Sequence, residues 1–207
     1  MLGKAVEKIH GLPHDFLGSL WDLIEKLAGD NGGKWLEELN HFRRKEPTWV
    51  NRLFEYVRGD GLPAIESFHF NDYIRGGKIG EVRVVFGDNL TKVFGGRVER
   101  DIPAETLVVQ KLTENSLDEP IIVALGGREC ATVKLGQLFA FMHKGRPRET
   151  CWFVFYVEDD QGVVWAVLCY WDTSAGYWHV EAFSTSRRYA WLAGRFFVSR
   201  DSDPECH

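Results

Sequence analysis

Aromatic side chains gather near the end of the chain, and this concentration is the strongest constraint on how the chain folds. The 207 residues include 8 Trp, 6 Tyr and 14 Phe, and half of these aromatic residues lie between Thr150 and Val198. The same segment has the pattern of antiparallel strands separated by turns. These strands carry apolar residues on both faces. One face must therefore meet the core, while the other is covered or binds a ligand.

Two turns fix the predicted pairing of these strands. The first turn is Asp159-Asp160-Gln161-Gly162, with Gly at a left-handed position. It predicts that Tyr156 lies opposite Trp165. The second turn, residues 172–176, predicts Cys169 opposite His179. A slip of one residue in either pairing would exchange the faces of a strand.

Side chains alternate along a strand, so the predicted register defines two faces. The face predicted to meet the core carries Phe153, Phe155, Ala166, Leu168, Tyr170, Trp178, Val180 and Ala182. The second face is aromatic but also holds a thiol, an imidazole and a carboxylate. It is predicted to carry Trp152, Tyr156, Trp165, Cys169, Trp171, Tyr177, His179 and Glu181.

The chain as a whole is predicted to be an α+β protein with an N-terminal helical hairpin over residues 1–48. Apolar residues at three- and four-residue steps mark its first helix, and a Gly-rich turn precedes the second. The stripe of the first helix consists of Leu17, Leu20, Trp21, Ile24 and Leu27. Residues 49–207 are predicted to form an α+β domain with a mixed middle and a C-terminal antiparallel meander. The hairpin is expected to pack with this domain as one unit and to cover the second aromatic face.

The middle of the chain has weaker patterns, which still predict individual strands and helices. Strands are predicted over residues 52–57, 80–86 and 106–112, where β-branched and aromatic residues are enriched. Short helices are predicted from Asp88 to Phe94, from Asp118 to Leu125, and around Leu135–Met142 with Thr132 as the cap.

The composition and charge of the chain disfavour several classes of partner and location. The net charge of −5 is spread evenly along the chain, which does not favour a polyphosphate partner. The four cysteines are scattered, there is no secretory signal, and no apolar run could span a membrane, so a cytoplasmic protein is expected. No complete metal-binding or nucleotide-binding motif is present in the sequence, so no cofactor is expected. The GxGxxA match at residues 59–64 is read as a surface turn, because Pro63 opposes the helix that a dinucleotide site requires.

One catalytic interpretation is a pair of Cys169 and His179 with Glu181 nearby. Cross-strand neighbours have Cβ atoms about 4.5–5.5 Å apart, close enough for imidazole to accept the thiol proton. Such a pair would indicate a small hydrolase or transferase. Nucleophilic thiols, however, are usually activated beside cations or at a helix N-terminus rather than between aromatic rings. The opposing interpretation is a buried Cys and a hydrogen-bonded His.

Arginines alternate with aromatic residues after the meander. Arg187, Arg188, Arg195 and Arg200 accompany Trp191, and no acidic residue lies between Phe183 and Arg200. This pattern is typical of a protein hot spot or of a surface that binds single-stranded nucleic acid. The opposing interpretation is a loop whose aromatic residues pack inward while its arginines are solvated.

Three segments resemble parts of a loose group of uncharacterised bacterial proteins of unknown function. They are GDNGGKWLEELNHFRRKEPTW, the stretch from Leu107 to Phe139 that includes KLTENSLDEPIIVALGG, and the aromatic hairpin ending in FFVSR. Together they cover about half of the chain. The resemblance implies no activity, ligand or site residue.

The sequence therefore favours a non-catalytic binding or protein-interaction domain that uses the second aromatic face or the arginine–aromatic stretch. The expected partner is another protein or a second copy of the chain, with no membrane partner. Nucleic-acid binding and the Cys–His enzyme are the alternatives. The residues predicted to bind are Trp152, Tyr156, Trp165, Trp171, Tyr177, Arg187, Arg188, Trp191 and Arg195.

Overall fold

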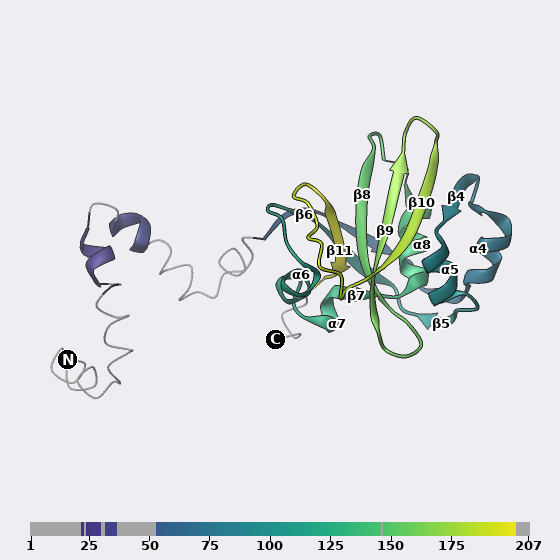
Figure 1. Cartoon of the computed structure of the whole chain (residues 1–207), viewed down its shortest axis with the longest axis horizontal. Coiled ribbons are helices and arrows are strands. Elements are labelled where there is room, and N and C mark those ends of the chain that lie inside the picture. The colour runs from purple at the N-terminus through teal and green to yellow at the C-terminus, as the bar shows by residue number, and fades with distance from the viewer. Residues whose placement is uncertain (1–21, 23, 30–31, 37–52, 146, 202–207) are drawn as a thin grey trace. The chain divides into compact units, whose positions relative to one another are not determined.

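The chain divides into two units in the computed structural model, Met1–Asn51 and Arg52–His207 (Figure 1). The structure describes residues 22, 24–29, 32–36, 53–145 and 147–201. Residues 24–28 and 32–36 are helical, in agreement with the predicted helices, whereas Leu17, Leu20 and Trp21 of the predicted stripe lie outside the described residues. The packing of the hairpin on the second unit stays a prediction.

The second unit has an α+β fold, as predicted. Its strands are β1 (Phe54–Leu62), β2 (Ile65–His69), β3 (Lys78–Ile79), β4 (Val82–Phe86), β5 (Val98–Ile102), β6 (Glu105–Leu112), β7 (Thr132–Val133), β8 (Cys151–Glu158), β9 (Val164–Asp172), β10 (Tyr177–Ser184) and β11 (Phe196–Arg200). Its helices are α4 (Phe70–Gly76), α5 (Asp88–Phe94), α6 (Asp118–Ala124), α7 (Arg128–Ala131) and α8 (Leu135–Lys144).

One large mixed sheet organises this unit. Its strands follow the order β1-β6-β11-β8-β9-β10-β4-β3, with β7 also paired to β8, and β2 and β5 form a separate two-stranded sheet. Strands β8, β9 and β10 are the predicted antiparallel meander. Strand β11 is parallel to β8, and β4 is parallel to β10, so strands distant in sequence extend the meander on both sides. Residues 59–61, expected in a surface turn, lie within β1 and pair with β6.

The register of β9 differs from the prediction by one residue. Tyr156 lies opposite Ala166, and Val157 lies opposite Trp165. The cause is the length of the first loop. The Asp159 N–H donates to the Val163 carbonyl at 2.9 Å, which leaves three residues in the loop, with Gly162 at φ 76°. A three-residue loop with a left-handed Gly shifts the pairing relative to the two-residue turn that was expected.

The second loop also shifts the pairing of β9 with β10 by one residue from the prediction. Tyr177 pairs with Asp172, so four residues form this loop, and Cys169 lies opposite Val180 rather than His179. The side chains of β8 and β10 share faces as predicted, but every side chain of β9 lies on the opposite face from the predicted one. Three β9 residues predicted for the second face are therefore on the first one: Trp165, Cys169 and Trp171. Three predicted for the core face are on the second one: Ala166, Leu168 and Tyr170.

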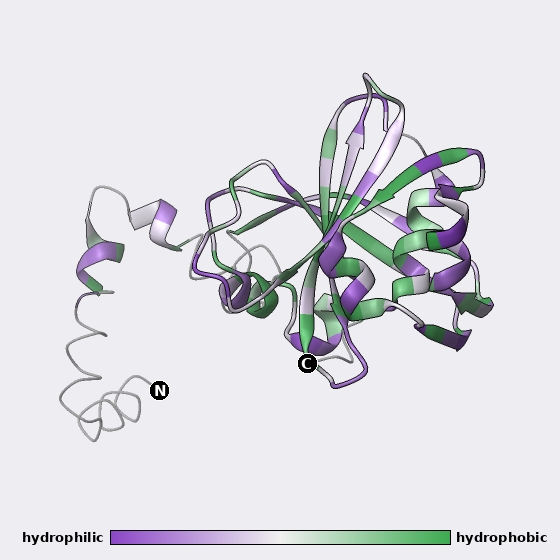
Figure 2. Cartoon of the chain, turned by 45° about the vertical axis from the view of Figure 1, so that its right-hand side comes forward, coloured by the Kyte–Doolittle hydropathy of each residue, from purple (hydrophilic) through white to green (hydrophobic). Residues whose placement is uncertain are grey.

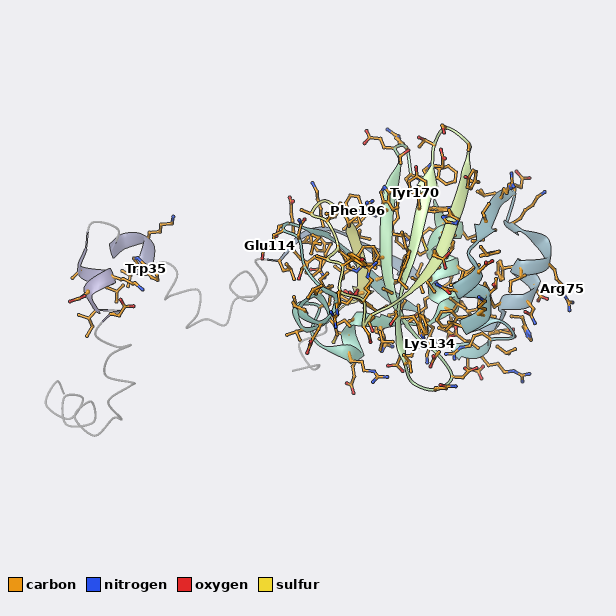
Figure 3. The ribbon with its side chains drawn as sticks, in the orientation of Figure 1. Trp35, Arg75, Glu114, Lys134, Tyr170 and Phe196 are labelled. Carbon is orange, nitrogen blue, oxygen red and sulfur yellow. The ribbon has the colours of Figure 1, made fainter. Side chains whose placement is uncertain are left out.

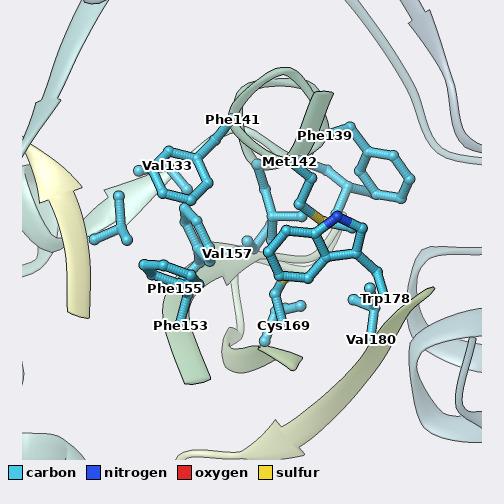
Figure 4. Packing of buried hydrophobic residues seen from close by; sticks show 14 of the residues in the cluster. Val133, Phe139, Phe141, Met142, Phe153, Phe155, Val157, Cys169, Trp178 and Val180 are labelled. Carbon is cyan, nitrogen blue, oxygen red and sulfur yellow. The ribbon is translucent and has the colours of Figure 1, made fainter. Parts of the chain in front are cut away.

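Helix α8 packs on the first face of the sheet and forms the larger core with it. The Phe141 ring lies edge-on to Phe153 and Phe155 of β8, with centroids 5.2 and 5.3 Å apart. Figure 4 shows Phe141 and Met142 of the helix together with Phe155 and Trp178 of the strands in this core. Burying one such side chain stabilises the fold by roughly 1.5–3 kcal/mol, so this layer fixes the helix on the sheet. In Figure 2 the strands of this unit alternate between hydrophobic segments and paler or hydrophilic ones along their length.

A buried carboxylate holds the start of α8. Glu99 of β5 accepts hydrogen bonds from the backbone N–H groups of Leu135 (3.2 Å) and Gly136 (2.8 Å) and pairs with Arg97 at 3.3 Å. A negative charge is favourable at this end of a helix, where N–H groups lack intrahelical partners. A Cβ atom on Gly136 would lie 2.7 Å from Cδ1 of Ile102 and 3.1 Å from Cβ of Phe68, so the close approach of these side chains favours glycine there.

Helices α6 and α7 cover part of the second face, together with the segment between β10 and β11. Trp191 anchors this segment through two backbone hydrogen bonds with Ser116, at 2.8 and 3.1 Å. The buried residues of this smaller core are Phe54, Leu112, Ile121, Leu125, Ala131, Val154, Tyr156, Ala166, Leu168, Trp191 and Phe197.

Candidate binding site

Three aromatic side chains lie side by side on the second face, one from each strand of the meander. Trp152 of β8 pairs with Tyr170 of β9, and Tyr170 pairs with His179 of β10. The Trp152 and Tyr170 rings are in contact, with centroids 4.2 Å apart and planes tilted by 39°. Figure 3 labels Tyr170 in the upper part of the sheet. Such cross-strand aromatic pairs hold each other's orientation.

Tyr177 extends this group along β10, on the same face as His179. The Arg83 guanidinium of the neighbouring β4 lies 5.7 Å from the centroid of the Tyr177 ring. We call Trp152, Tyr170, Tyr177 and His179 the aromatic patch; each is partly exposed. Trp152 borders the smaller core, whereas the other three lie outside both buried clusters found among the described residues. The patch is thus the part of the second face that the helices of this unit leave accessible.

Arg195 closes one end of the patch. Its Cζ atom lies 3.8 Å from the centroid of the Trp152 ring, a cation–π contact. Burial lowers the pKa of the Arg195 guanidinium, which nevertheless stays charged at neutral pH. The patch therefore presents an indole, two phenols and an imidazole on the sheet, with the Arg195 cation stacked at one end.

Three other residues predicted to bind have an internal role instead. They surround Asp118, whose side chain is 1% exposed. Tyr156 Oη and Trp191 Nε1 donate to Asp118 Oδ1 at 2.8 and 2.7 Å, and Arg187 Nε donates to Oδ2 at 3.3 Å. Burial, followed by the charge of Asp118, strongly raises the pKa of the Tyr156 hydroxyl, which stays protonated. This cluster connects α6 to β8 and to the segment before β11.

The tryptophans of β9 also face away from the patch. Trp165 donates its Nε1–H to Asp159 Oδ2 at 2.9 Å, beside the first loop of the meander. Trp171 is buried in the larger core beside Trp178, with ring centroids 5.2 Å apart. The register shift of β9 places both of these predicted binding residues on the first face.

The predicted arginine–aromatic surface is reduced by internal contacts. Arg187 is paired with Asp118, Arg195 stacks on Trp152, and Arg200 Nε donates to Glu105 Oε1 at 2.7 Å. Arg188 and Tyr189 remain exposed. One exposed arginine gives little of the positive charge that a nucleic-acid groove uses.

The predicted Cys–His pair is wrong, because its members lie on opposite faces of the sheet. Cys169 has no exposed surface and packs in the larger core, and burial raises the pKa of its thiol well above the ordinary value. His179 and Glu181 are on the second face, where Glu181 lies opposite Leu168. A deeply buried thiol with a raised pKa carries little thiolate and is a poor nucleophile.

The described residues contain no group of three or more His, Cys, Asp or Glu side chains arranged to hold a metal ion. Among their helices, none has the length and apolar character needed to span a membrane.

Two residues of the second face have a role that local sequence patterns do not indicate. The two-residue first turn predicts Tyr170 for the core face; Gly162 as the third and left-handed residue of the loop is the signal that favours a three-residue loop instead. Asp118 was recognised only as the start of a helix, although its three partners come from segments 38 to 73 residues away.

Comparisons with family models, with curated proteins and with solved structures found no match to this chain. The resemblance of its three segments to a loose bacterial group therefore stays a prediction.

Proposed function

We propose that this chain is a non-catalytic binding domain that recognises a protein partner through the aromatic patch. The observation that carries the proposal is the stack of Arg195, Trp152 and Tyr170, partly exposed on a sheet whose other face is filled by α8. Aromatic rings and arginine held in fixed positions are the side chains that contribute most at protein interfaces. The strands beneath them reduce the entropy lost on binding.

Charge favours a protein partner over a nucleic acid. The chain carries a net charge of −5, and three of the four arginines in the C-terminal arginine–aromatic stretch are engaged in internal contacts. Electrostatic attraction to phosphates, which supplies much of the affinity of nucleic-acid-binding proteins, is therefore weak here. A cytoplasmic location stays a prediction.

The patch is tested by comparing two tyrosines. Affinity capture from extracts of the producing cells is run with the wild-type chain, with Tyr170→Ala and with Tyr189→Ala. Tyr189 is the matched control, because it is 81% exposed and belongs to the segment after β10 rather than to the patch. Partners held by the patch should be recovered with wild type and with Tyr189→Ala but lost with Tyr170→Ala. Loss of a hot-spot residue should weaken a purified pair by about 2 kcal/mol or more, roughly 30-fold.

Circular dichroism of each variant establishes that it is folded before the captures are compared. The proposal is abandoned if folded Tyr170→Ala keeps every partner of the wild type, or if the bound material is nucleic acid that a moderate rise in salt releases.

A further inference from the structure

A cavity opens on the first face of the sheet, on the opposite side from the aromatic patch. Its volume is about 580 Å³, within the range of roughly 300–1,000 Å³ that is typical of small-molecule sites. It lies between β1, the end of α8 and the start of β8. The residues lining it come from segments far apart in sequence, so only the folded chain forms it.

Aromatic rings form the floor of the cavity. Phe153 is in contact with Phe141 and Phe196, with ring centroids 5.2 and 5.5 Å apart, and Trp178 lies 6.2 Å from Phe153. Phe141, Phe153 and Trp178 are each buried in the core, so the floor is held rigidly. Phe196 is partly exposed, so its ring offers the apolar surface that a flat apolar ring can contact.

The rim of the cavity is charged and has an excess of one positive charge. Three cations (Arg58, Lys144 and Arg148) and two carboxylates (Asp60 and Glu149) line it. Arg58 Nε contacts Asp60 Oδ2 at 2.8 Å, and Lys144 Nζ lies 3.7 Å from Oδ1 of the same carboxylate. Asp60 is thus shared by two cations, which leaves positive charge for an anion at the rim.

Arg58 connects the rim to the floor. Its Cζ atom lies 6.0 Å from the centroid of the Phe141 ring. A ligand ring on the floor would place a carboxylate within reach of this guanidinium, which can bind a carboxylate through two parallel hydrogen bonds.

We propose that this cavity binds a small aromatic carboxylate, with the ring on the aromatic floor beside Phe196 and the carboxylate at Arg58. The apolar floor selects the ring, and the excess positive charge selects the anion. The proposal is independent of the aromatic patch, because the two sites lie on opposite faces of the sheet and share no residue.

The probes are 2-naphthoate and its uncharged analogue 2-naphthamide, titrated into the full chain by isothermal calorimetry. Naphthoate should bind more tightly than naphthamide. Arg58→Gln should weaken naphthoate about fivefold, a modest factor because the rim is exposed to solvent, and should leave naphthamide nearly unchanged. Arg75→Gln, on exposed α4, is the matched control and should change neither affinity.

Cys151 reports where the probe binds, since it lines the cavity and is half-buried. Burial raises the pKa of its thiol to about 11, partly opposed by Arg58, so alkylation is followed at pH 9, in a chain with Cys206→Ser. Naphthoate should slow alkylation of Cys151 by iodoacetamide in proportion to its occupancy. Absence of binding at millimolar naphthoate, equal affinities for the two probes, or unprotected Cys151 at saturation would each overturn the proposal.

Discussion

Replacing Asp118 with alanine is expected to lower the free energy of unfolding by about 3–5 kcal/mol. The carboxylate accepts hydrogen bonds from Tyr156, Trp191 and Arg187, and it is 1% exposed. Its removal leaves a buried hydroxyl, a buried indole N–H and a largely buried cation without their partner. The cost of unpaired buried groups exceeds the value of the bonds themselves.

The environment of Arg187 also predicts a large loss of stability when Asp118 is removed. Its guanidinium lies 3.7 Å from the centroid of the Trp191 ring and 5.2 Å from that of Phe183, and its Nη2 atom is buried with no hydrogen-bond partner among the described residues. Asp118 is the carboxylate that pairs with it. Asp118→Asn keeps an acceptor for Trp191 but removes the charge that Arg187 needs, so its cost should lie between wild type and Asp118→Ala.

The matched control is Asp88→Ala. Asp88 is also the first residue of a seven-residue helix, α5, but its side chain is exposed. Its replacement should cost less than about 1 kcal/mol, through the helix dipole alone. Urea unfolding followed by circular dichroism measures all three variants. Similar losses for Asp118→Ala and Asp88→Ala would show that the buried network does not stabilise the fold.

Trp178→Ala is expected to cost about 3–5 kcal/mol as well, by leaving a large void in the first-face core. Trp178 is 1% exposed and contacts Trp171, with ring centroids 5.2 Å apart. Trp152→Ala, the same substitution two strands away on the opposite face, should cost less than about 2 kcal/mol, because that ring is partly exposed. The difference between the two values measures how differently the two faces are buried.

The substitution Trp178→Phe refines this comparison. The Trp178 Nε1–H is buried and has no hydrogen-bond partner among the described residues. Phenylalanine fills much of the space and removes this unpaired donor, so the cost should be well below that of alanine. If Trp152→Ala proved as destabilising as Trp178→Ala, the assignment of the two faces would be wrong.

Local signals in the sequence were enough for several elements of the fold. The predicted helices beginning at Asp88 and Asp118 are α5 and α6, and apolar spacing after Lys134 identified α8. The strands of the meander are also predictable from local signals, because the alternation of side chains along each strand is visible within a few residues. Thr132 was wrong as the cap of α8, which begins after Lys134.

The elements that were missed depend on partners far away in sequence. Local patterns predict no separate strand at β11, because its place between β6 and β8 comes from pairing across about 40 and 85 residues. Strand β5 carries the buried Glu99. A search for alternating hydrophobic residues does not find a strand with a buried carboxylate, and the hydrogen-bond partners of Glu99 lie on α8. The site itself depended on the register of β9, which two loop lengths decide and which a one-residue error inverts.

Ring contacts measured by NMR decide whether the meander has a buried first face and an aromatic second face. Nuclear Overhauser effects should connect the rings of Trp152 and Tyr170, 4.2 Å apart, and those of Trp171 and Trp178, 5.2 Å apart. Contacts between the rings of Trp171 and Tyr177, with none between Trp152 and Tyr170, would contradict this register and remove the basis of the aromatic patch.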